Sequence, residues 1–258
     1  MGHPDLELTG HTAVVIGGTS GIGLAIVEGL AKAGANVVPT GRRANLIQSA
    51  AALVEKLGRQ SLTVACDVTR RSSMEDLWAA VCAKFPTVEI LVNCAGTTQR
   101  TPALDLSEEE WNRIVATNLT GVLRACQTFG RHMINRKYGR IINIASLTSV
   151  LGMYEVAAYA ASKAGVASLT RSLAVEWARD GVCVNAILPG VFPTDLNATL
   201  LNGTARGQEL ILRTPMRRFG KVEELAGAAV FLASPAAGFV TGHLLAVDGG
   251  FLASGVNQ

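Results

Sequence analysis

The sequence of 258 residues has few of the features that mark membrane, secreted or metal-binding proteins. No apolar run approaches the length of a membrane-spanning helix, about 18 residues. The first residues lack the basic and apolar regions of a signal peptide. The five cysteines form no Cys-x-x-Cys pair and the four histidines lie far apart, so we expect no metal site. This cysteine usage predicts a reduced protein of the cytoplasm.

The sequence also has little net charge. Its 23 basic and 20 acidic residues give +3 and form no clustered basic stripe, so we expect no nucleic-acid partner. Hydrophobic residues make up 49% of the chain, which excludes a disordered protein and supplies a buried core. No linker, composition shift or internal repeat marks a boundary, so a single domain over residues 1–258 is predicted.

Short apolar runs alternate with longer segments of helical periodicity. This alternation predicts an α/β protein with a doubly wound Rossmann fold, in which helices cover both faces of a parallel sheet. The predicted strands are 12–17, 36–40, 61–66, 88–93, 139–146, 182–188 and 244–247, and the predicted helices are 22–33, 44–57, 72–84, 107–136, 156–178 and 222–233. Two of these helices carry capping-box signatures, Ser72 with Glu75 and Ser107 with Glu110. Residues 191–219 show no clear period, which favours a lid or substrate loop.

A glycine-rich loop follows the first predicted strand. Its glycines allow a tight turn and close approach of the backbone to a pyrophosphate, while the next helix offers free N–H groups and a positive dipole end. The spacing is Gly-x-x-x-Gly-x-Gly, and a plain glycine-rich turn is the alternative. The predicted dinucleotide-binding residues of the loop are Gly17, Thr19, Ser20, Gly21, Ile22 and Gly23.

No acidic residue ends the second predicted strand, where an acid would hold the ribose hydroxyls of NAD. Arg42 and Arg43 stand there instead, and Arg42 lies 19 residues after Gly23. Guanidinium groups suit a 2′-phosphate, so NADP(H) is favoured and NAD(H) stays open. The alternative is that both arginines only begin a solvated helix. Asp67, after the third predicted strand, is placed either to accept a bond from adenine or to begin a helix.

The long helix predicted over 156–178 carries Tyr159 and Lys163, which are four positions apart and therefore share a helix face. A tyrosine has an ordinary pKa of about 10 and little phenolate at neutral pH. A close ammonium, together with the positive nicotinamide of a cofactor, would favour the phenolate. The pair predicts a general acid/base; an ordinary amphipathic pair is the alternative.

Two further polar residues belong to this constellation. Ser146 ends the strand predicted over 139–146, and the carboxyl ends of parallel strands are where such sheets build sites. A hydroxyl there can orient a substrate carbonyl oxygen. Asn118 interrupts an apolar helical pattern in which Asn is a poor helix former, so it requires a partner or bends the helix by a hydrogen bond.

Over nearly its whole length the sequence resembles the short-chain dehydrogenase/reductase family. The motifs that carry the resemblance are the Gly17–Gly23 loop, Asp67-Val68, Asn93-Cys94-Ala95-Gly96, Asn118, Ser146, Tyr159 with Lys163, Pro189-Gly190 with Thr194, and Val247-Asp248-Gly249-Gly250. The resemblance implies a seven-stranded sheet and hydride transfer between NAD(P) and a carbinol or carbonyl. It departs from the family at Ile16, where a Thr is usual, and at Cys94, where an Asn is usual.

The resemblance also implies residue roles. Tyr159 would be the general acid/base, and Lys163 would lower its pKa and bind the nicotinamide ribose. Ser146 would hold the substrate oxygen, and Asn118 would keep a water in a proton relay. Beyond the glycine loop, the implied cofactor contacts are Arg42, Arg43, Asp67, Val68, Asn93, Ala95, Gly96, Tyr159, Lys163, Pro189, Gly190, Phe192 (by its backbone) and Thr194.

The substrate signal is a set of arginines. Arg100 lies four residues after Gly96, and Arg213, Arg217 and Arg218 are close in sequence. A cationic mouth suits an anionic substrate, whereas solvated surface arginines are the alternative.

Residues 99–102 and 213–250 are most similar to the gluconate 5-dehydrogenases and related sugar-acid reductases. This similarity implies a sugar acid or polyol that contacts Arg100, Ser146 and Tyr159. A 3-oxoacyl-type reductase is the second reading, and a non-catalytic dinucleotide sensor is a remote third. The family further implies a homotetramer, with the apolar stretch 249–256 as a candidate interface.

Overall fold

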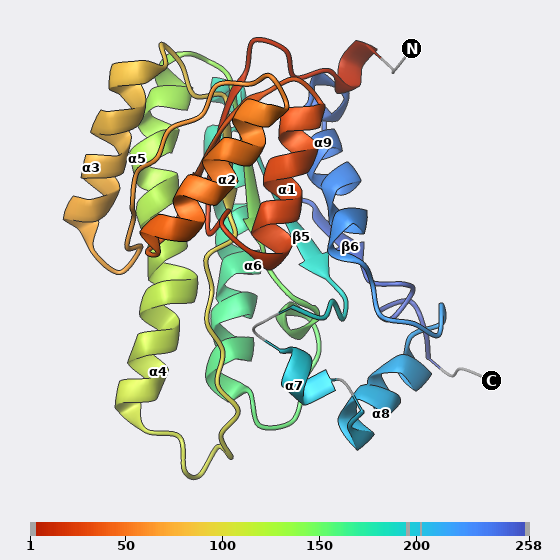
Figure 1. Ribbon diagram of the computed structural model, residues 1–258. Helices are drawn as coiled ribbons and strands as arrows, with labels where there is room; N and C mark the ends of the chain where they lie inside the picture. The colour runs from red at the N-terminus through yellow and green to blue at the C-terminus, as the bar shows by residue number, and fades with distance from the viewer. Residues whose placement is uncertain (1–3, 195–196, 202, 256–258) are drawn as a thin grey trace.

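The computed structural model describes residues 4–194, 197–201 and 203–255. Within them, six parallel strands form one sheet in the order β2-β1-β3-β4-β5-β6 (Figure 1). The strands are β1 (Thr12–Ile16), β2 (Asn36–Thr40), β3 (Ile90–Asn93), β4 (Gly139–Ile144), β5 (Val182–Pro189) and β6 (Leu244–Val247). The switch in strand order between β1 and β3 places a crevice above the carboxyl ends of the strands, where open α/β sheets bind ligands.

Helices cover both faces of this sheet. They are α1 (Gly21–Lys32), α2 (Ala44–Lys56), α3 (Arg71–Lys84), α4 (Glu108–Val115), α5 (Gly121–Asn135), α6 (Ala157–Trp177), α7 (Ala198–Leu201), α8 (Ala205–Arg213) and α9 (Ala226–Ala233). Single turns lie at Pro4–Leu6, Leu147–Ser149, Ala178–Asp180, Val222–Leu225 and Pro235–Ala237.

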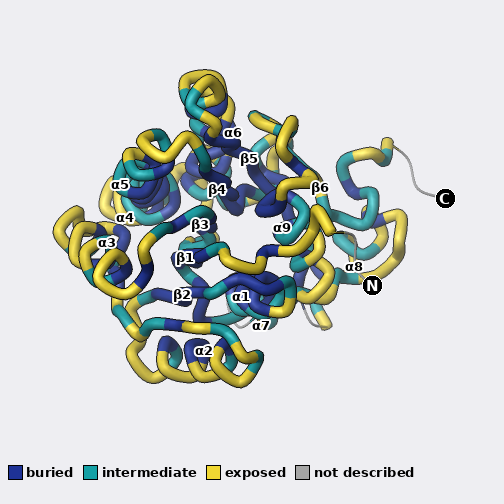
Figure 2. Tube along the Cα trace, turned by 90° about the horizontal axis from the view of Figure 1, so that it is seen from above, coloured by how far each residue is buried: buried dark blue, intermediate teal, exposed yellow. Residues whose placement is uncertain are grey.

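Most positions of β1–β5 are buried and apolar because both faces of these strands are covered. In β1, Val14 and Ile16 pack into one cluster with α3, α5 and α6. Ala13 and Val15 point to the other face and pack with α1, α2 and α9. Successive strand residues alternate between the two faces, so each face needs its own apolar set. Figure 2 looks down on the sheet and shows the buried positions of both helical layers turned inward.

The sequence predicts seven strands, but the sheet of the described residues has six, and the predicted strand 61–66 is the missing one. The predicted strand 61–66 runs beside β2 but forms a single β-bridge, Gly41 with Ala65. Val37 donates to the carbonyl of Gln60 and Cys66 donates to that of Gly41, so the odd residues of β2 face this segment. Pro39 is the residue between them, and it has no N–H to donate. The ladder is therefore interrupted at its centre.

The helix predicted over 107–136 is present but broken. Residues Ala116–Thr120 form a π-helical turn between α4 and α5. The capping box at Ser107 is confirmed on one side, because its hydroxyl accepts from the N–H of Glu110. The box at Ser72 is wrong: α3 begins at Arg71, one residue earlier, and its N-cap position is Arg70.

The segment 191–219 contains α7 and α8, which the sequence pattern does not predict. Residues 195, 196 and 202 of that segment, residues 1–3, and residues 256–258 at the end of the predicted interface stretch lie outside the described residues. In the described part of the chain, no helix is long and apolar enough to cross a membrane.

Candidate active site

Four sequence-predicted segments meet at the carboxyl edge of the sheet. The glycine loop follows β1, Asn93 ends β3, Ser146 follows β4, and Pro189 ends β5. The neighbouring strands are in parallel register, Ile16 beside Asn93 and Asn143 beside Ala186, so these ends lie side by side. The edge gathers residues from far apart in the sequence into one place, as the topology requires.

The glycine loop is fixed by backbone contacts. A Cβ on Gly23 would lie 2.0 Å from the carbonyl oxygen of Gly17, and one on Gly17 would lie 2.5 Å from the nitrogen of Ala95. Gly17 also has φ +82°, a conformation that side chains disfavour. Its N–H donates to the carbonyl of Thr40 at 2.8 Å, and Cys94 donates to the carbonyl of Ile16 at 2.8 Å. These backbone bonds anchor the loop although Ile16 replaces the usual Thr.

The start of α1 faces an open turn. Ser20 stands at the N-cap position with no side-chain cap bond, so N–H groups of the first turn remain for a ligand. Thr194 lies above this turn: a Cβ on Gly21 would be 3.2 Å from its Cγ2. Free N–H groups at a helix start suit a pyrophosphate.

Arg42 and Arg43 lie beside this turn. The Nη2 of Arg43 donates to the Ser20 hydroxyl at 3.3 Å. The positive charge of Arg42 reaches Asp67, although the pKa of Asp67 is lowered first by hydrogen bonds from Thr69. The predicted adenosine end therefore brings together Arg42, Arg43, Ser20 and Asp67, with cations next to the helix start.

Asn118 is fully buried in the π-helical turn and is held on three sides. Its Oδ1 accepts from the N–H of Thr97 at 2.8 Å, and its Nδ2 donates to the carbonyl of Thr97 at 2.9 Å. The same Nδ2 donates to the hydroxyl of Ser162 at 3.1 Å, and that hydroxyl donates to the carbonyl of Tyr159. Asn118 thus ties the loop after β3 to the first turns of α6.

The four predicted catalytic residues lie close together. Lys163 is buried, and its Nζ donates to the carbonyl of Ile144 at 2.7 Å while lying 5.7 Å from the centre of the Tyr159 ring. The Ser146 hydroxyl accepts from the N–H of Thr148 and also hydrogen-bonds the Tyr159 side chain. A hydroxyl, a phenol and an amine therefore converge from β4 and α6.

The electrostatics of the protein alone do not favour a phenolate. Burial raises the pKa of Tyr159, the hydrogen bond from Ser146 lowers it by less, and Cys94 adds to the rise. Burial lowers the pKa of Lys163 to about 8. Burial is the largest influence on the pKa of Tyr159 in the protein without a cofactor. A lowered value stays a prediction for the state with a bound cofactor.

Of the remaining predicted cofactor contacts, Gly96 lies beside the predicted catalytic side chains, whereas Asn93 and Val68 make contacts within the fold. Gly96 lies beside two of the predicted catalytic side chains: a Cβ there would be 3.5 Å from Asn118 Oδ1 and 3.7 Å from Lys163 Nζ. The Asn93 side chain instead bonds within the fold, donating to Asn143 at 2.8 Å. Val68 packs against Gly121, where a Cβ would lie 2.9 Å from the valine.

The segment after β5 is braced from several sides. Gly190 donates to the carbonyl of Val247 at 2.9 Å, and the Phe192 ring packs on Gly220, where a Cβ would lie 2.2 Å away. Asn197 donates to the carbonyl of Phe192 and accepts from the N–H of Thr194 at 2.8 Å. The sequence analysis missed Asn197 because it lies in the segment without clear period.

Arg100 has a charged partner, Glu155. Its Nε forms an ion pair with Glu155 at 2.5 Å, and its guanidinium lies 6.0 Å from the centre of the Tyr154 ring. Glu155 adopts φ +61°, and its carbonyl accepts from the N–H of Thr101. The sequence analysis missed this partner, which is 55 residues away along the chain.

The other three arginines have nearby partners. Arg218 pairs with Glu224 at 2.6 Å, Arg213 with Glu209 at 3.7 Å, and Arg217 donates to the carbonyl of Leu212. The alternative of surface arginines therefore holds for Arg218, since its bond is bidentate and exposed.

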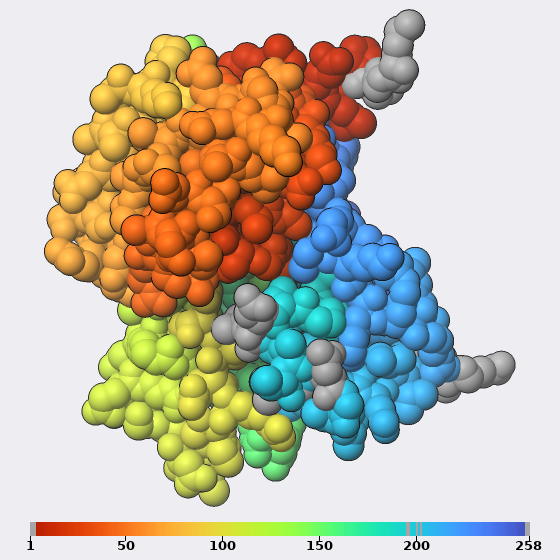
Figure 3. All heavy atoms as spheres, viewed as in Figure 1, coloured from red at the N-terminus to blue at the C-terminus, as the bar shows by residue number. Residues whose placement is uncertain are grey.

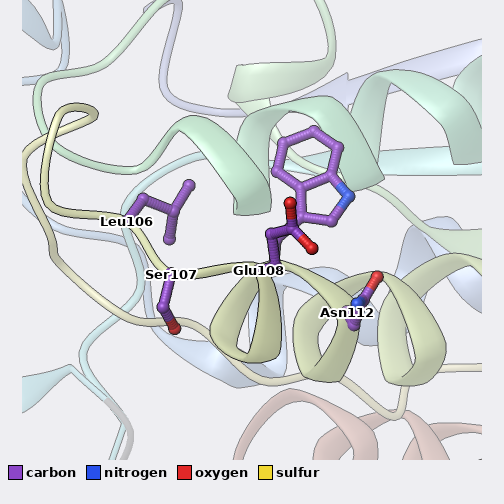
Figure 4. A pocket seen from close by; sticks show the side chains of 5 residues that line it. Leu106, Ser107, Glu108 and Asn112 are labelled. Carbon is purple, nitrogen blue, oxygen red and sulfur yellow. The ribbon is translucent and has the colours of Figure 1, made fainter.

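Two surface cavities are present near this edge of the molecule. One, of about 350 Å³, lies between α8, the segment 151–154 and Arg100; we call it the arginine pocket, and its polar members are Arg100, Arg206, Glu209 and Arg213. The other, of about 440 Å³, lies at the first turn of α4 and is lined by Leu106, Ser107, Glu108, Trp111 and Asn112 (Figure 4). The sequence analysis predicts no catalytic or ligand-binding role for any of these lining residues.

The described residues contain no group of three or more His, Cys, Asp or Glu side chains that could hold a metal ion. Cys94 lies near Lys163, and burial raises the pKa of its thiol to about 11, so the thiol is neutral at neutral pH. Tyr159, Ser146 and Lys163 are groups that can transfer protons and form hydrogen bonds at this site.

The comparisons with known proteins identify the family. Residues 16–252 match the sequence model of a family described as enoyl-(acyl carrier protein) reductase. The chain is 41% identical over 255 residues to the gluconate 5-dehydrogenase of Gluconobacter oxydans (strain 621H), covering 98% of this chain and 100% of the relative. With its doubly wound sheet and Tyr159 and Lys163 beside a glycine loop, the chain belongs to the short-chain dehydrogenase/reductase family and is an oxidoreductase.

Two further similarities concern a reductase sequence and a solved structure. The chain is 40% identical over 245 residues to a 3-oxoacyl-(acyl-carrier-protein) reductase of Vibrio cholerae, covering 95% of this chain and 98% of the relative. It superposes with a TM-score of 0.93 on the gluconate 5-dehydrogenase from Burkholderia cenocepacia J2315 in complex with NADP and tartrate. That structure is 37% identical, and the match covers 97% of this chain and 98% of the other.

Proposed function

We propose that this protein is an NADP(H)-dependent dehydrogenase/reductase that interconverts a secondary alcohol and a ketone on a sugar acid or polyol. The observation that carries the proposal is the convergence of Tyr159, Ser146 and Lys163 beside a glycine loop. The names of the Gluconobacter and Burkholderia relatives support the sugar acid as substrate class.

The residues present fit a dinucleotide phosphate. Gly17 and Gly23 leave no space for a Cβ, and the first turn of α1 has no side-chain cap. Arg42 and Arg43 supply positive charge beside Ser20, where a 2′-phosphate would be bound and a ribose-binding acid is lacking. When bound, the nicotinamide supplies the hydride acceptor or donor. NAD(H) remains an option that the same glycine loop would accommodate.

Each side chain of the site has a proposed task. Ser146 orients the substrate oxygen, and Tyr159 accepts or delivers the proton at that oxygen. Lys163 holds the nicotinamide ribose and stabilises negative charge on the phenol. Asn118 fixes the loop at Thr97 against α6, and its π-helical turn is where a relay water would be held.

Arg100 is proposed to face the acid group of the substrate. It lines the arginine pocket and is one side of an ion pair that is partly exposed. Substrate contacts of Ser146 and Tyr159 lie at the reacting carbon, so Arg100 acts at the far end of the molecule.

A 3-oxoacyl reductase is the second candidate, and the 40% identity to the Vibrio cholerae enzyme favours it. Its thioester substrate is larger and also negatively charged. A non-catalytic sensor is disfavoured, because Asn118, Ser146, Tyr159 and Lys163 are all present and in place.

The deciding experiment is a substrate and cofactor screen with the purified protein. NADPH oxidation is measured with 5-ketogluconate and acetoacetyl thioester, and NADP+ reduction with gluconate. The Tyr159→Phe variant should lower kcat by roughly 100- to 10,000-fold, because it removes the general acid/base. NADPH binding, followed by fluorescence, should stay within twofold; near-full turnover by the variant would remove Tyr159 from this role.

We also propose that the enzyme is a cytoplasmic homotetramer. The family resemblance suggests the tetramer, and the apolar stretch beginning at Gly249 is the proposed interface. The five described cysteines are all free, which suits a reducing compartment. Sedimentation equilibrium would measure the mass of the assembly.

A further inference from the structure

The arginine pocket has walls from three segments that follow different strands. Arg100 follows β3, the segment 151–154 follows β4 and the turn Leu147–Ser149, and α8 follows β5. Each segment leaves the same carboxyl edge that carries the catalytic residues. In the space-filling view α7 and α8 lie in the lower right part of the molecule, below the red and orange N-terminal residues (Figure 3). The pocket therefore lies on the substrate side of the site.

The three arginines of the pocket differ in how far their charge is neutralised. Glu155 holds Arg100 at 2.5 Å, and Glu209 lies 3.7 Å from Arg213. Arg206 belongs to none of the ion pairs formed among the described residues. Its Nη1 donates a long bond of 3.4 Å to the carbonyl of Tyr154, which leaves most of its donors available. Arg206 is thus the cation of the pocket with the least compensated charge.

The surroundings of Arg206 strengthen its attraction for an anion. It is the second residue of α8, so it lies at the positive end of the helix dipole. The side chain is half-buried, and Leu151, Met153 and Leu210 supply apolar wall to the same pocket. Ionic bonds are stronger where water is partly excluded.

We propose that the arginine pocket is the subsite for the carboxylate of the substrate and that Arg206 is the residue that binds it. A guanidinium fits a carboxylate with two parallel bonds. The inference rests on the proposed function and narrows its substrate class to hydroxy and keto acids whose carboxylate is remote from the reacting carbon. Arg100, already paired with Glu155, then contributes less than Arg206.

The test compares Arg206→Gln with Arg131→Gln, an equivalent change at an exposed arginine of α5 that lies outside the arginine pocket. For Arg206→Gln, KM for 5-ketogluconate should rise roughly tenfold, as expected for loss of one charge-assisted bond. KM for fructose, a neutral ketose with the same number of carbons, and kcat for both substrates should change less than twofold. Arg131→Gln should resemble the wild type, and Arg206→Lys should recover part of the loss.

Equal KM increases for the keto acid and the ketose, or equal effects of the Arg206 and Arg131 substitutions, would overturn the inference. An increase confined to acetoacetyl thioester would also overturn it. Direct titration of gluconate onto the protein with NADP bound separates this inference from the proposed function. Binding to the wild type and loss of binding in Arg206→Gln, with no turnover of any sugar acid, would retain the subsite and refute the activity.

Discussion

The cofactor side and the substrate side of the crevice are built differently. On the proposed cofactor side the groups are tightly enclosed: a Cβ on Gly17 or Gly23 would clash with backbone atoms, and the Asn118 side chain is buried with three hydrogen bonds. On the substrate side, side chains carry the chemistry. Arg100 and Arg206 extend from partly exposed segments and bond through one or two contacts each.

This difference separates two kinds of specificity. Contacts made by a backbone that tolerates no Cβ cannot be retuned by one substitution, so the reaction type is rigidly set. Contacts made by long cationic side chains on α8 and the segment after β3 can change without disturbing the sheet. Substrate choice is therefore the more adjustable property of this fold.

The first prediction of this comparison concerns Lys163, which is buried on the proposed cofactor side. Since burial lowers its pKa from 10.5 to about 8, the unfolded chain binds more protons between these values, and stability must rise with pH across that window. Relative to Lys163→Met, the unfolding free energy of the cofactor-free wild type should increase by up to about 3 kcal/mol from pH 7 to pH 10.5. Denaturant titrations at several pH values measure it.

The matched control for Lys163 is Lys32→Met, at a lysine whose side chain is 61% exposed and which pairs with Glu28. That variant should show no such trend, because an exposed ammonium keeps its hydration. A flat difference between the wild type and Lys163→Met would mean that the ammonium is not desolvated in the folded protein.

The second prediction concerns Arg42, at the predicted adenosine end of the cofactor site. Arg42→Ala should weaken NADPH binding by roughly 10- to 100-fold, since a charge-assisted bond to the 2′-phosphate is lost. NADH binding should change by less than twofold, because NADH has no such phosphate. Fluorescence titration with both cofactors measures the ratio, and equal losses would refute the assignment.

The smallest predicted effect lies on the substrate side. Arg100→Ala should raise KM for sugar acids by roughly two- to fivefold, as expected for a partly exposed ion pair, and should leave neutral polyols unchanged. Glu155→Gln should act in the opposite direction, because it releases Arg100 from its partner. Steady-state kinetics with gluconate and glucitol measure both, and an unchanged ratio would remove Arg100 from substrate binding.

The sequence predicts the buried part of the fold well, because a strand covered on both faces is apolar at most of its positions. It fails at 61–66, since the apolar run is there but its neighbour Pro39 lacks the required N–H. Which strand lies beside which is a property of the topology and cannot be seen in the segment itself. The capping box predicted at Ser72 is absent because α3 begins one residue earlier, at Arg71. The hydroxyl of the next residue, Ser73, accepts from the N–H of Asp67.

The candidate site is predictable where one spacing fixes it. Tyr159 and Lys163 share a face because they are four residues apart, and the glycine loop is marked by its composition. Glu155, Ser162 and Asn197 could not be found, because each acts through a partner that only folding brings near. Arg206 lies in an aperiodic segment, and nothing in its sequence context separates it from other surface arginines.

The π-helical turn at Ala116–Thr120 has a consequence for how this chain can vary in length. A wider turn holds one residue more than an ordinary helical turn, and each helical residue advances the direction of the side chains by about 100°. Removing a single residue there would let α4 and α5 fuse into one continuous rod. The faces on either side would then rotate relative to each other, and Asn118 would swing away from Thr97. The number of residues in this turn is therefore constrained as strictly as the identity of Asn118.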